Sequence, residues 1–175
     1  MSDDRMRFVV EMYEVTLSRA FERTFADLEE GEAEWRPLPE SNNIALIVRH
    51  LAIESKWHLD CLERGVPMVF HPSPELQSEI DAVPMDLGTN LSELKTCLHR
   101  FLERLRETSE EQLQKHSASA YGERAAKWPH FLGYHQAIHL FGHLGQISMI
   151  RNLYRRTRGR PGFIPENPTY PKPSL

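Results

Sequence analysis

The stretch "GVPMVFHPSPELQSEIDAVPMDLG", residues 65–88, decides the topology of the chain, because it separates two long segments with helical periodicity. A connection of roughly two dozen residues is uncommon in a compact domain unless it crosses the body or forms a lid. In helical bundles, a long crossover places the two helices that it joins parallel to each other. Residues 74–81 within the stretch predict a short helix of their own.

Apolar residues recur at helical spacing in four segments, and no segment alternates as a strand does. The first segment spans about residues 6–28, and the fourth runs from near Pro129 to about Arg158. A further helical turn is expected at residues 109–112, after the third segment. The second follows the N-cap candidates Ser41 and Asn42 and ends before Gly65, and the third has capping-box spacing between Asn90 and Glu93.

The chain is therefore expected to be all-α, a four-helix bundle in up-down-down-up order with a long crossover between helices 2 and 3. Residues 1–158 are expected to form this single domain, and the proline-rich residues 159–175 a tail outside it.

The composition of the chain disfavours some kinds of binding partner. A net charge of -4 and a pI near 6.1 give no reason to expect nucleic acid, and no apolar run approaches the ~20 residues of a membrane helix. The acidic start, "MSDDRMRFVV", lacks the basic residues of a signal peptide, and two cysteines suit reduced thiols better than a disulfide framework. We expect a cytoplasmic protein without membrane or nucleic-acid partners.

The histidines of "HQAIHLFGHLGQ", residues 135–146, indicate a metal site. His139 and His143 are four residues apart and can share one ion, whereas His135 to His143 spans ~12 Å of helix, too far for a single ion. A third ligand must come from another helix. His50 is the best candidate, and His58 and His99 are alternatives.

Other residues near these histidines carry weaker expectations. The stripe of His135, His139 and His143 is expected to face the bundle interior together with Gly142, Gln146, Met149, Ile150 and Leu153. His135 is expected to cap the site or bind water, and His58 to be partly exposed. Glu54 either orients a ligand imidazole or is a solvated helix carboxylate. Cys61 and Cys97 are expected to be buried, and Arg151, Arg155, Arg156, Arg158 and Arg160 to form a solvated helix end.

Two stretches, "NNIALIVRHLAIESKW" and "HLFGHLGQISMIRNLY", together resemble the DinB/YfiT superfamily of metal-binding four-helix bundles. The resemblance covers roughly residues 5–157 and includes a loop with Trp35, Pro37 and Pro39. It places the metal triad of that family on His50, His139 and His143, followed by Gly145 and Gln146 as its Gly-Gln pair. It also implies the crossover topology and a homodimer.

Three imidazoles leave a divalent ion, zinc or nickel, with an open position, as in catalytic sites. The resemblance implies a thiol-dependent S-transferase in which the metal holds a low-molecular-weight thiol as a nucleophile toward a small-molecule substrate, with Gln146 as a catalytic hydrogen-bonding residue. The alternatives are a metal-dependent hydrolase and a metal-binding bundle without catalytic activity. Leu140 stands where the glutamate of an H-E-x-x-H motif would be, which disfavours hydrolysis.

Overall fold

A computed structural model of the chain describes residues 2–66, 73–121 and 131–162, and the side chains of residues 7–66, 73–117 and 132–162. All regular structure within these ranges is helical. The predicted start of the last helix near Pro129 and most of the proline-rich tail lie outside them.

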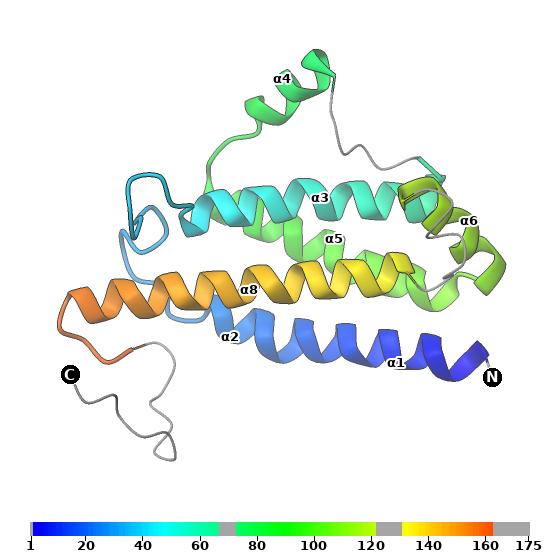
Figure 1. Ribbon diagram of the computed structural model, residues 1–175, viewed down its shortest axis with the longest axis horizontal. Helices are drawn as coiled ribbons and strands as arrows, with labels where there is room; N and C mark the ends of the chain where they lie inside the picture. The colour runs from blue at the N-terminus through cyan, green and yellow to red at the C-terminus, as the bar shows by residue number, and fades with distance from the viewer. Residues whose placement is uncertain (1, 67–72, 122–130, 163–175) are drawn as a thin grey trace.

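Four long helical segments form the bundle (Figure 1). The first is continuous through α1 (Ser2–Val15), the π-helical η1 (Thr16–Phe21) and α2 (Glu22–Phe25). The other three are α3 (Ile44–Arg64), α5 (Leu87–Glu107) and α8 (Phe131–Thr157). Two shorter helices lie in the connections, α4 (Pro74–Ala82) and α6 (Glu110–Tyr121).

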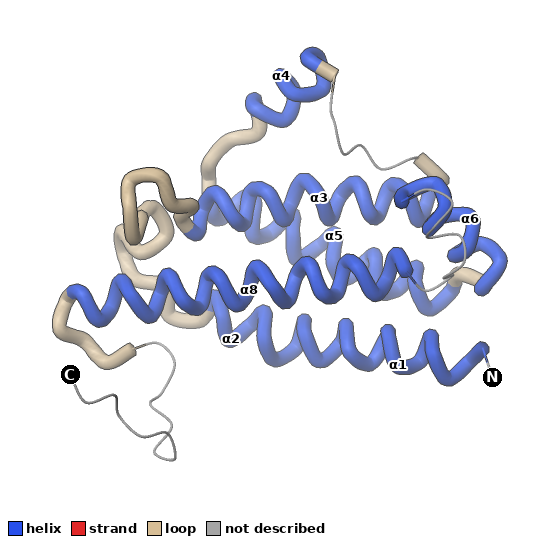
Figure 2. Tube along the Cα trace, viewed as in Figure 1, coloured by secondary structure: helices blue, strands red, loops and turns tan. Residues whose placement is uncertain are grey.

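Contacts between α3 and α5 show that the two helices are parallel. Arg49, near the start of α3, donates through Nε to the Val83 carbonyl just before α5, at 2.8 Å. Glu63, at the far end of α3, accepts from Arg100 in the second half of α5, also at 2.8 Å. The predicted crossover is confirmed, and its short helix is α4, which stands outside the bundle in Figure 2.

The outer helices complete the up-down-down-up order. Lys95 of α5 pairs with Glu22 and Arg106 pairs with Glu14, so the first segment runs antiparallel to α5. Inside the bundle, the Gln136 amide of α8 donates to the Ser55 hydroxyl of α3 at 2.9 Å. Gln136 is near the start of α8, whereas His139, further along α8, contacts His50, which is nearer the start of α3, so α8 runs antiparallel to α3.

Helix ends follow the sequence with two corrections. Asn43, one residue beyond the predicted caps, accepts from the Leu46 amide at 2.8 Å and begins α3. Asp86 accepts from the Thr89 amide at 2.7 Å, so α5 begins before the predicted capping box at Asn90. Gly65 ends α3 with φ 67°, the left-handed conformation that glycine adopts without strain.

Aliphatic and aromatic side chains from all four long segments fill the core. Those fully or almost fully buried include Tyr13, Leu17, Leu51, Leu98, Phe101, Leu105, Leu140 and Ile147. On α5, the buried leucine and phenylalanine side chains are Leu94, Leu98, Phe101, Leu102 and Leu105, and Leu91 is half-buried near the start of the helix.

A buried ion pair joins the end of α8 to the loop after α2. Arg151 and Glu32 are both 0% exposed, and Arg151 Nε lies 2.7 Å from Glu32 Oε1. The same guanidinium donates to the carbonyls of Thr24 and Asp27 at 2.6 and 2.9 Å. The prediction of a solvated arginine cluster is therefore wrong for Arg151, because this residue holds the loop against the bundle.

Candidate metal centre

Three histidines from two helices converge near the middle of the bundle. His50 is on α3, and His139 and His143 are one turn apart on α8. His139 Nε2 lies 3.3 Å from His50 Nε2 and 3.0 Å from His143 Nε2. One nitrogen from each ring lies within 4.8 Å of the other two, so the three side chains can hold one metal ion.

The spacing of these nitrogens agrees with what an ion requires. Two imidazole nitrogens, each at ~2.0–2.1 Å from a tetrahedral zinc ion, lie ~3.3 Å from each other. The separations of 3.0 and 3.3 Å are close to that value, and the nitrogens of the third pair, His50 and His143, lie within 4.8 Å. In addition, His139 Nδ1 is buried with no hydrogen-bond partner among the described residues. The imidazoles are therefore arranged around a common point more than toward protein partners.

Gln146 fixes the tautomer of His143. Its amide oxygen lies 2.9 Å from His143 Nδ1, which therefore carries the proton and donates it. In the neutral ring, the lone pair is then on Nε2, the atom that faces His139. Gln146 thus holds one candidate ligand in the form that binds metal.

Burial keeps the three rings neutral. It lowers the pKa of His139 to about 3, with further contributions from His143 and His50. It also lowers the pKa of His50 and of His143, although the hydrogen bond that His143 donates to Gln146 opposes the shift at His143. Because a metal ion binds the neutral imidazole, these directions favour binding at neutral pH.

Glu54 lies beside the same nitrogens. Its two carboxylate oxygens are 3.3 Å from His139 Nε2 and 3.6 Å from His50 Nε2. A carboxylate that orients a ligand imidazole contacts the ring nitrogen opposite the metal, so Glu54 is not placed for that role. Burial raises its pKa, and His143 opposes the shift. Glu54 instead faces the point where the three Nε2 atoms meet.

Two further histidines, His58 and His135, lie beside the triad. His58 is only 1% exposed, which contradicts the expectation of a partly exposed residue. Its Nδ1 donates to the Glu54 carbonyl at 2.7 Å, and burial lowers its pKa to about 4. The His135 ring lies between those of His58 and His139, with centroids 5.9 and 6.0 Å away. The structure brings His135 next to the triad but not into it.

The histidine stripe of α8 lies at the edge of the buried face and not, as predicted, at its centre. Met149 is 56% exposed and Leu153 38% exposed, whereas Leu140, Leu144 and Ile147 are buried. A Cβ added at Gly142 or at Gly145 would meet nothing within 4 Å. Of the predicted stripe, only Ile150 is fully inside. The edge position is what lets the triad border a cavity.

Other candidates from the sequence are separated from the triad. His99 is exposed on α5, where its Nδ1 donates to the Lys95 carbonyl at 2.8 Å, so it is not the third ligand. Cys61 and Cys97 are buried, as predicted, and burial raises the pKa of both thiols.

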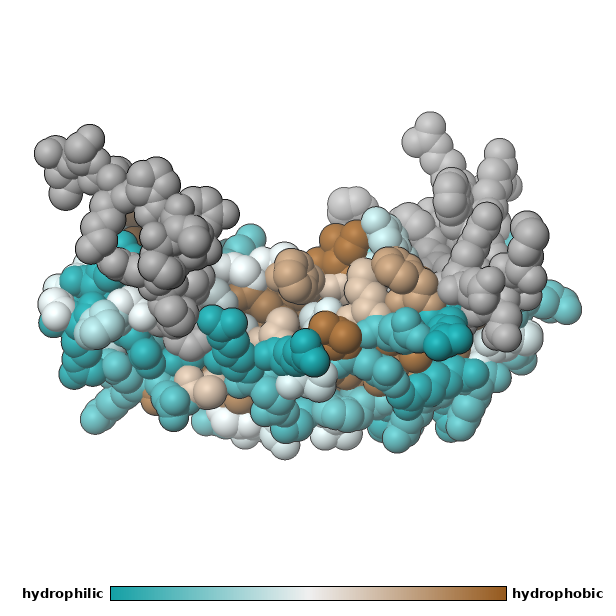
Figure 3. All heavy atoms as spheres, turned by 90° about the horizontal axis from the view of Figure 1, so that it is seen from below, coloured by the Kyte–Doolittle hydropathy of each residue, from teal (hydrophilic) through white to brown (hydrophobic). Residues whose placement is uncertain are grey.

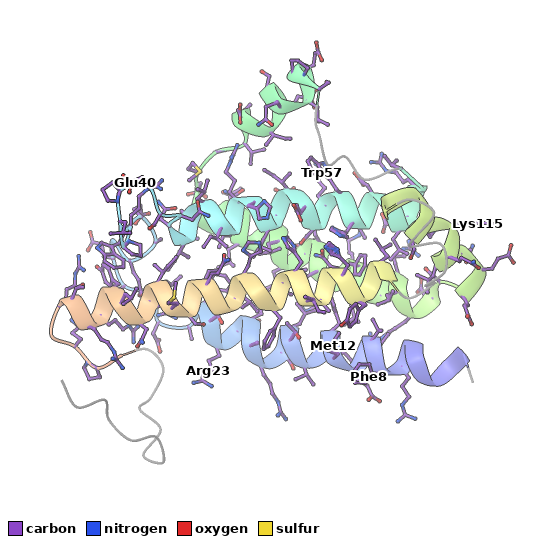
Figure 4. The ribbon with its side chains drawn as sticks, in the orientation of Figure 1. Phe8, Met12, Arg23, Glu40, Trp57 and Lys115 are labelled. Atoms are coloured by element: carbon purple, nitrogen blue, oxygen red, sulfur yellow. The ribbon has the colours of Figure 1, made fainter. Side chains whose placement is uncertain are left out.

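A cavity of about 380 Å³ opens beside the triad, between α3 and the crossover. His50, His143 and Glu54 are in its lining, and Ile80 comes from α4. Trp57 also lines it, and Figure 4 places this residue on the side of α3 that faces the crossover. Sequence reasoning did not single out Arg49, another lining residue, because its position depends on how the crossover packs.

Comparison with known proteins agrees with this site. The family model described as the DinB superfamily matches residues 13–147, which include all three histidines. No curated protein and no solved structure matches the chain. No helix among the described residues is long and apolar enough to cross a membrane. The match covers well over half of the sequence, and the chain belongs to the DinB superfamily.

Proposed function

We propose that the protein binds one divalent ion, zinc or nickel, through His50, His139 and His143, and that it is an enzyme acting on small molecules. The observation that carries the proposal is the convergence of three neutral imidazole nitrogens, with 3.0 and 3.3 Å between neighbours, at the edge of a cavity. Three protein ligands leave a position for a reactant, which is the pattern of catalytic zinc sites.

The leading reaction is the transfer of a small thiol to an electrophile. An ion held by the triad lowers the pKa of a thiol or water that it contacts. Glu54 is placed to take the thiol proton, because its oxygens lie within 3.6 Å of the nitrogens that face the ion position. The sulfur then attacks an electrophilic carbon, forming the S–C bond as the leaving group departs with its electron pair. Gln146 keeps His143 oriented, and its amide nitrogen can donate to the incoming group.

Hydrolysis is the second candidate, and Glu54 is the observation that favours it. The sequence lacks a glutamate next to His139, but the carboxylate of Glu54 on α3 lies 3.3 Å from His139 Nε2. With water as the attacking group, Glu54 takes its proton, and an ester or amide carbonyl is the acceptor.

Cobalt substitution tests the leading reaction. The cobalt-loaded protein is titrated with 2-mercaptoethanol, cysteine and glutathione while its absorption spectrum is recorded. We expect a sulfur-to-cobalt charge-transfer band that saturates with thiol and is absent from a His139→Ala variant. Bound cobalt whose spectrum no thiol changes would reject thiol transfer. Ester and amide panels would then distinguish hydrolysis from a bundle in which the ion has no catalytic role.

We also propose a homodimer formed through α8. Its exposed apolar side chains are Tyr134, Ile138, Phe141, Met149 and Leu153, and Phe8 and Val15 of α1 extend the surface. Figure 3 shows apolar residues gathered in the middle of the face on which α1 lies. Gly142 and Gly145 leave space for a second helix to approach. In light scattering, Phe141→Glu should yield monomers and Leu38→Glu, which changes an exposed loop residue, should not. A monomeric parent protein would contradict this assembly.

A further inference from the structure

The lining of the cavity beside the triad includes apolar side chains and two charged residues, Glu54 and Arg49. Leu46, Ile47, Ile53, Trp57 and Ile80 supply apolar surface. Glu54 lies at the end near the histidines, and Arg49 is the basic residue of the lining. A volume of about 380 Å³ is near the lower limit for small-molecule sites, so the cavity suits a compact ligand.

Arg49 is held in place by backbone atoms. Its Nε donates to the Val83 carbonyl at 2.8 Å, and one terminal nitrogen donates to the Ile80 carbonyl. These bonds use the N–H groups on one edge of the guanidinium. A guanidinium has five N–H groups, so the opposite edge keeps a pair that can bind an anion in bidentate fashion. Arg49 is therefore a fixed donor whose second edge has no partner among the described residues.

No carboxylate among the described residues forms an ion pair with Arg49, in contrast to Arg100, Arg104, Arg106, Arg151 and Arg160. Carbonyl groups fix the guanidinium but do not neutralise its charge. The positive charge thus remains on the cavity wall. The planar fork of a guanidinium suits bidentate recognition of carboxylate or phosphate.

We propose that Arg49 binds the anionic group of the substrate, a small molecule with an apolar body and a carboxylate. The apolar body packs against Trp57 and Ile80, and the reactive end reaches the histidines. This assignment rests on the proposed function for the position of the reactive end, but the recognition of the anion by Arg49 can be tested without thiol and in a variant that lacks one of the three histidines.

Calorimetric titration with 3-phenylpropionate and 3-phenylpropionamide tests the assignment, because the two probes share a shape and differ in charge. We expect the zinc-loaded protein to bind the carboxylate about tenfold more tightly than the amide, as a charged hydrogen-bonded pair requires. Arg49→Gln should remove this preference and leave the amide affinity unchanged. Arg49→Lys, which keeps the charge but not the fork, should retain part of it.

His139→Ala separates this inference from the metal-site proposal. A preference that survives in His139→Ala and disappears in Arg49→Gln supports anion binding by Arg49, whatever happens to the ion. If Arg49→Gln still prefers the carboxylate to the amide, the proposal is overturned. If His139→Ala loses the preference, the ion and not Arg49 binds the carboxylate. Equal weakening of both probes in Arg49→Gln would mean that Arg49 only anchors the crossover. Failure of both probes to bind would likewise contradict the assignment.

Discussion

Two polar clusters on α8, one fully buried around Arg151 and one half-buried around His139, differ in whether protein groups satisfy all their polar atoms. At Arg151, Glu32 neutralises the charge of the guanidinium, and Glu32 and two backbone carbonyls accept its hydrogen bonds. At His139, twelve residues earlier, the Nε2 atom faces other imidazoles and Glu54, and Nδ1 has no partner among the described residues. The protein satisfies the first cluster completely, whereas in the second cluster three imidazole nitrogens lie within 4.8 Å of one another and could hold an ion. The comparison separates a structural cluster from a candidate binding site.

The largest effect is expected at the completed cluster. Arg151→Met leaves Glu32 buried without its partner, and such a change costs about 3–5 kcal/mol of unfolding free energy. Urea denaturation measures the loss. Adding Glu32→Leu should recover part of it, since the unpaired charge is removed. A change below about 1 kcal/mol in Arg151→Met would show that this cluster does not hold the loop.

The opposite pattern is expected at the incomplete cluster. His139→Ala should weaken zinc binding at least about a hundredfold, equivalent to about 2.7 kcal/mol, because one of three ligands is lost. The stability of the metal-free protein should change by less than about 1 kcal/mol, since the ring has few partners to lose. Competition with a chelating dye gives the affinity. A large loss of metal-free stability would place His139 with Arg151 as a structural residue.

The pH dependence of the unfolding free energy tests the burial of His58, whose ring lies next to the site. The pKa of His58 is about 4 in the folded protein and near 6.5 when unfolded, so the unfolded chain binds more protons between these values. Stability from this residue is present above pH 6.5 and is lost as pH falls, by about 2 kcal/mol between pH 7 and pH 5. Chemical denaturation should show a flatter profile for His58→Leu. Parallel profiles would contradict the assignment.

The smallest effect is expected at Glu54. Its oxygens lie near the ion position but outside the triad, so Glu54→Gln should change zinc affinity by about tenfold. The effect on turnover should be larger if Glu54 moves a proton. Asp60→Asn, which changes a carboxylate of the same helix that is paired with Arg64, is the matched control. Equal responses of the two variants would remove Glu54 from the site.

Local rules predicted most of the fold. Apolar periodicity located the long helices, Gly65 marked the end of α3, and the length of the 65–88 stretch indicated parallel neighbours. Caps were misplaced at Asn42 and Asn90 because neighbouring polar residues compete for one role, and tertiary contacts choose among them. Asn43, for example, also donates to the Glu34 carbonyl at 3.2 Å.

The spacing of His139 and His143 within α8 predicted two candidate ligands. Burial and side-chain contacts that depend on tertiary packing could not be predicted from spacing. His58 and His99 are both helix histidines, yet one is buried and the other exposed. The burial of Arg151 depends on Glu32, which lies more than a hundred residues away in sequence. The contacts of Glu54 and Arg49 likewise depend on how α8 and the crossover lie against α3.

Metal content of the purified protein tests the central claim most directly. After incubation with excess zinc and gel filtration, elemental analysis should find one ion per chain in the parent protein. His50→Ala, which changes the ligand farthest from the others in sequence, should retain almost none, while His99→Ala should retain one. A parent protein that keeps no ion, or a His50→Ala variant that binds zinc as the parent does, would contradict the account.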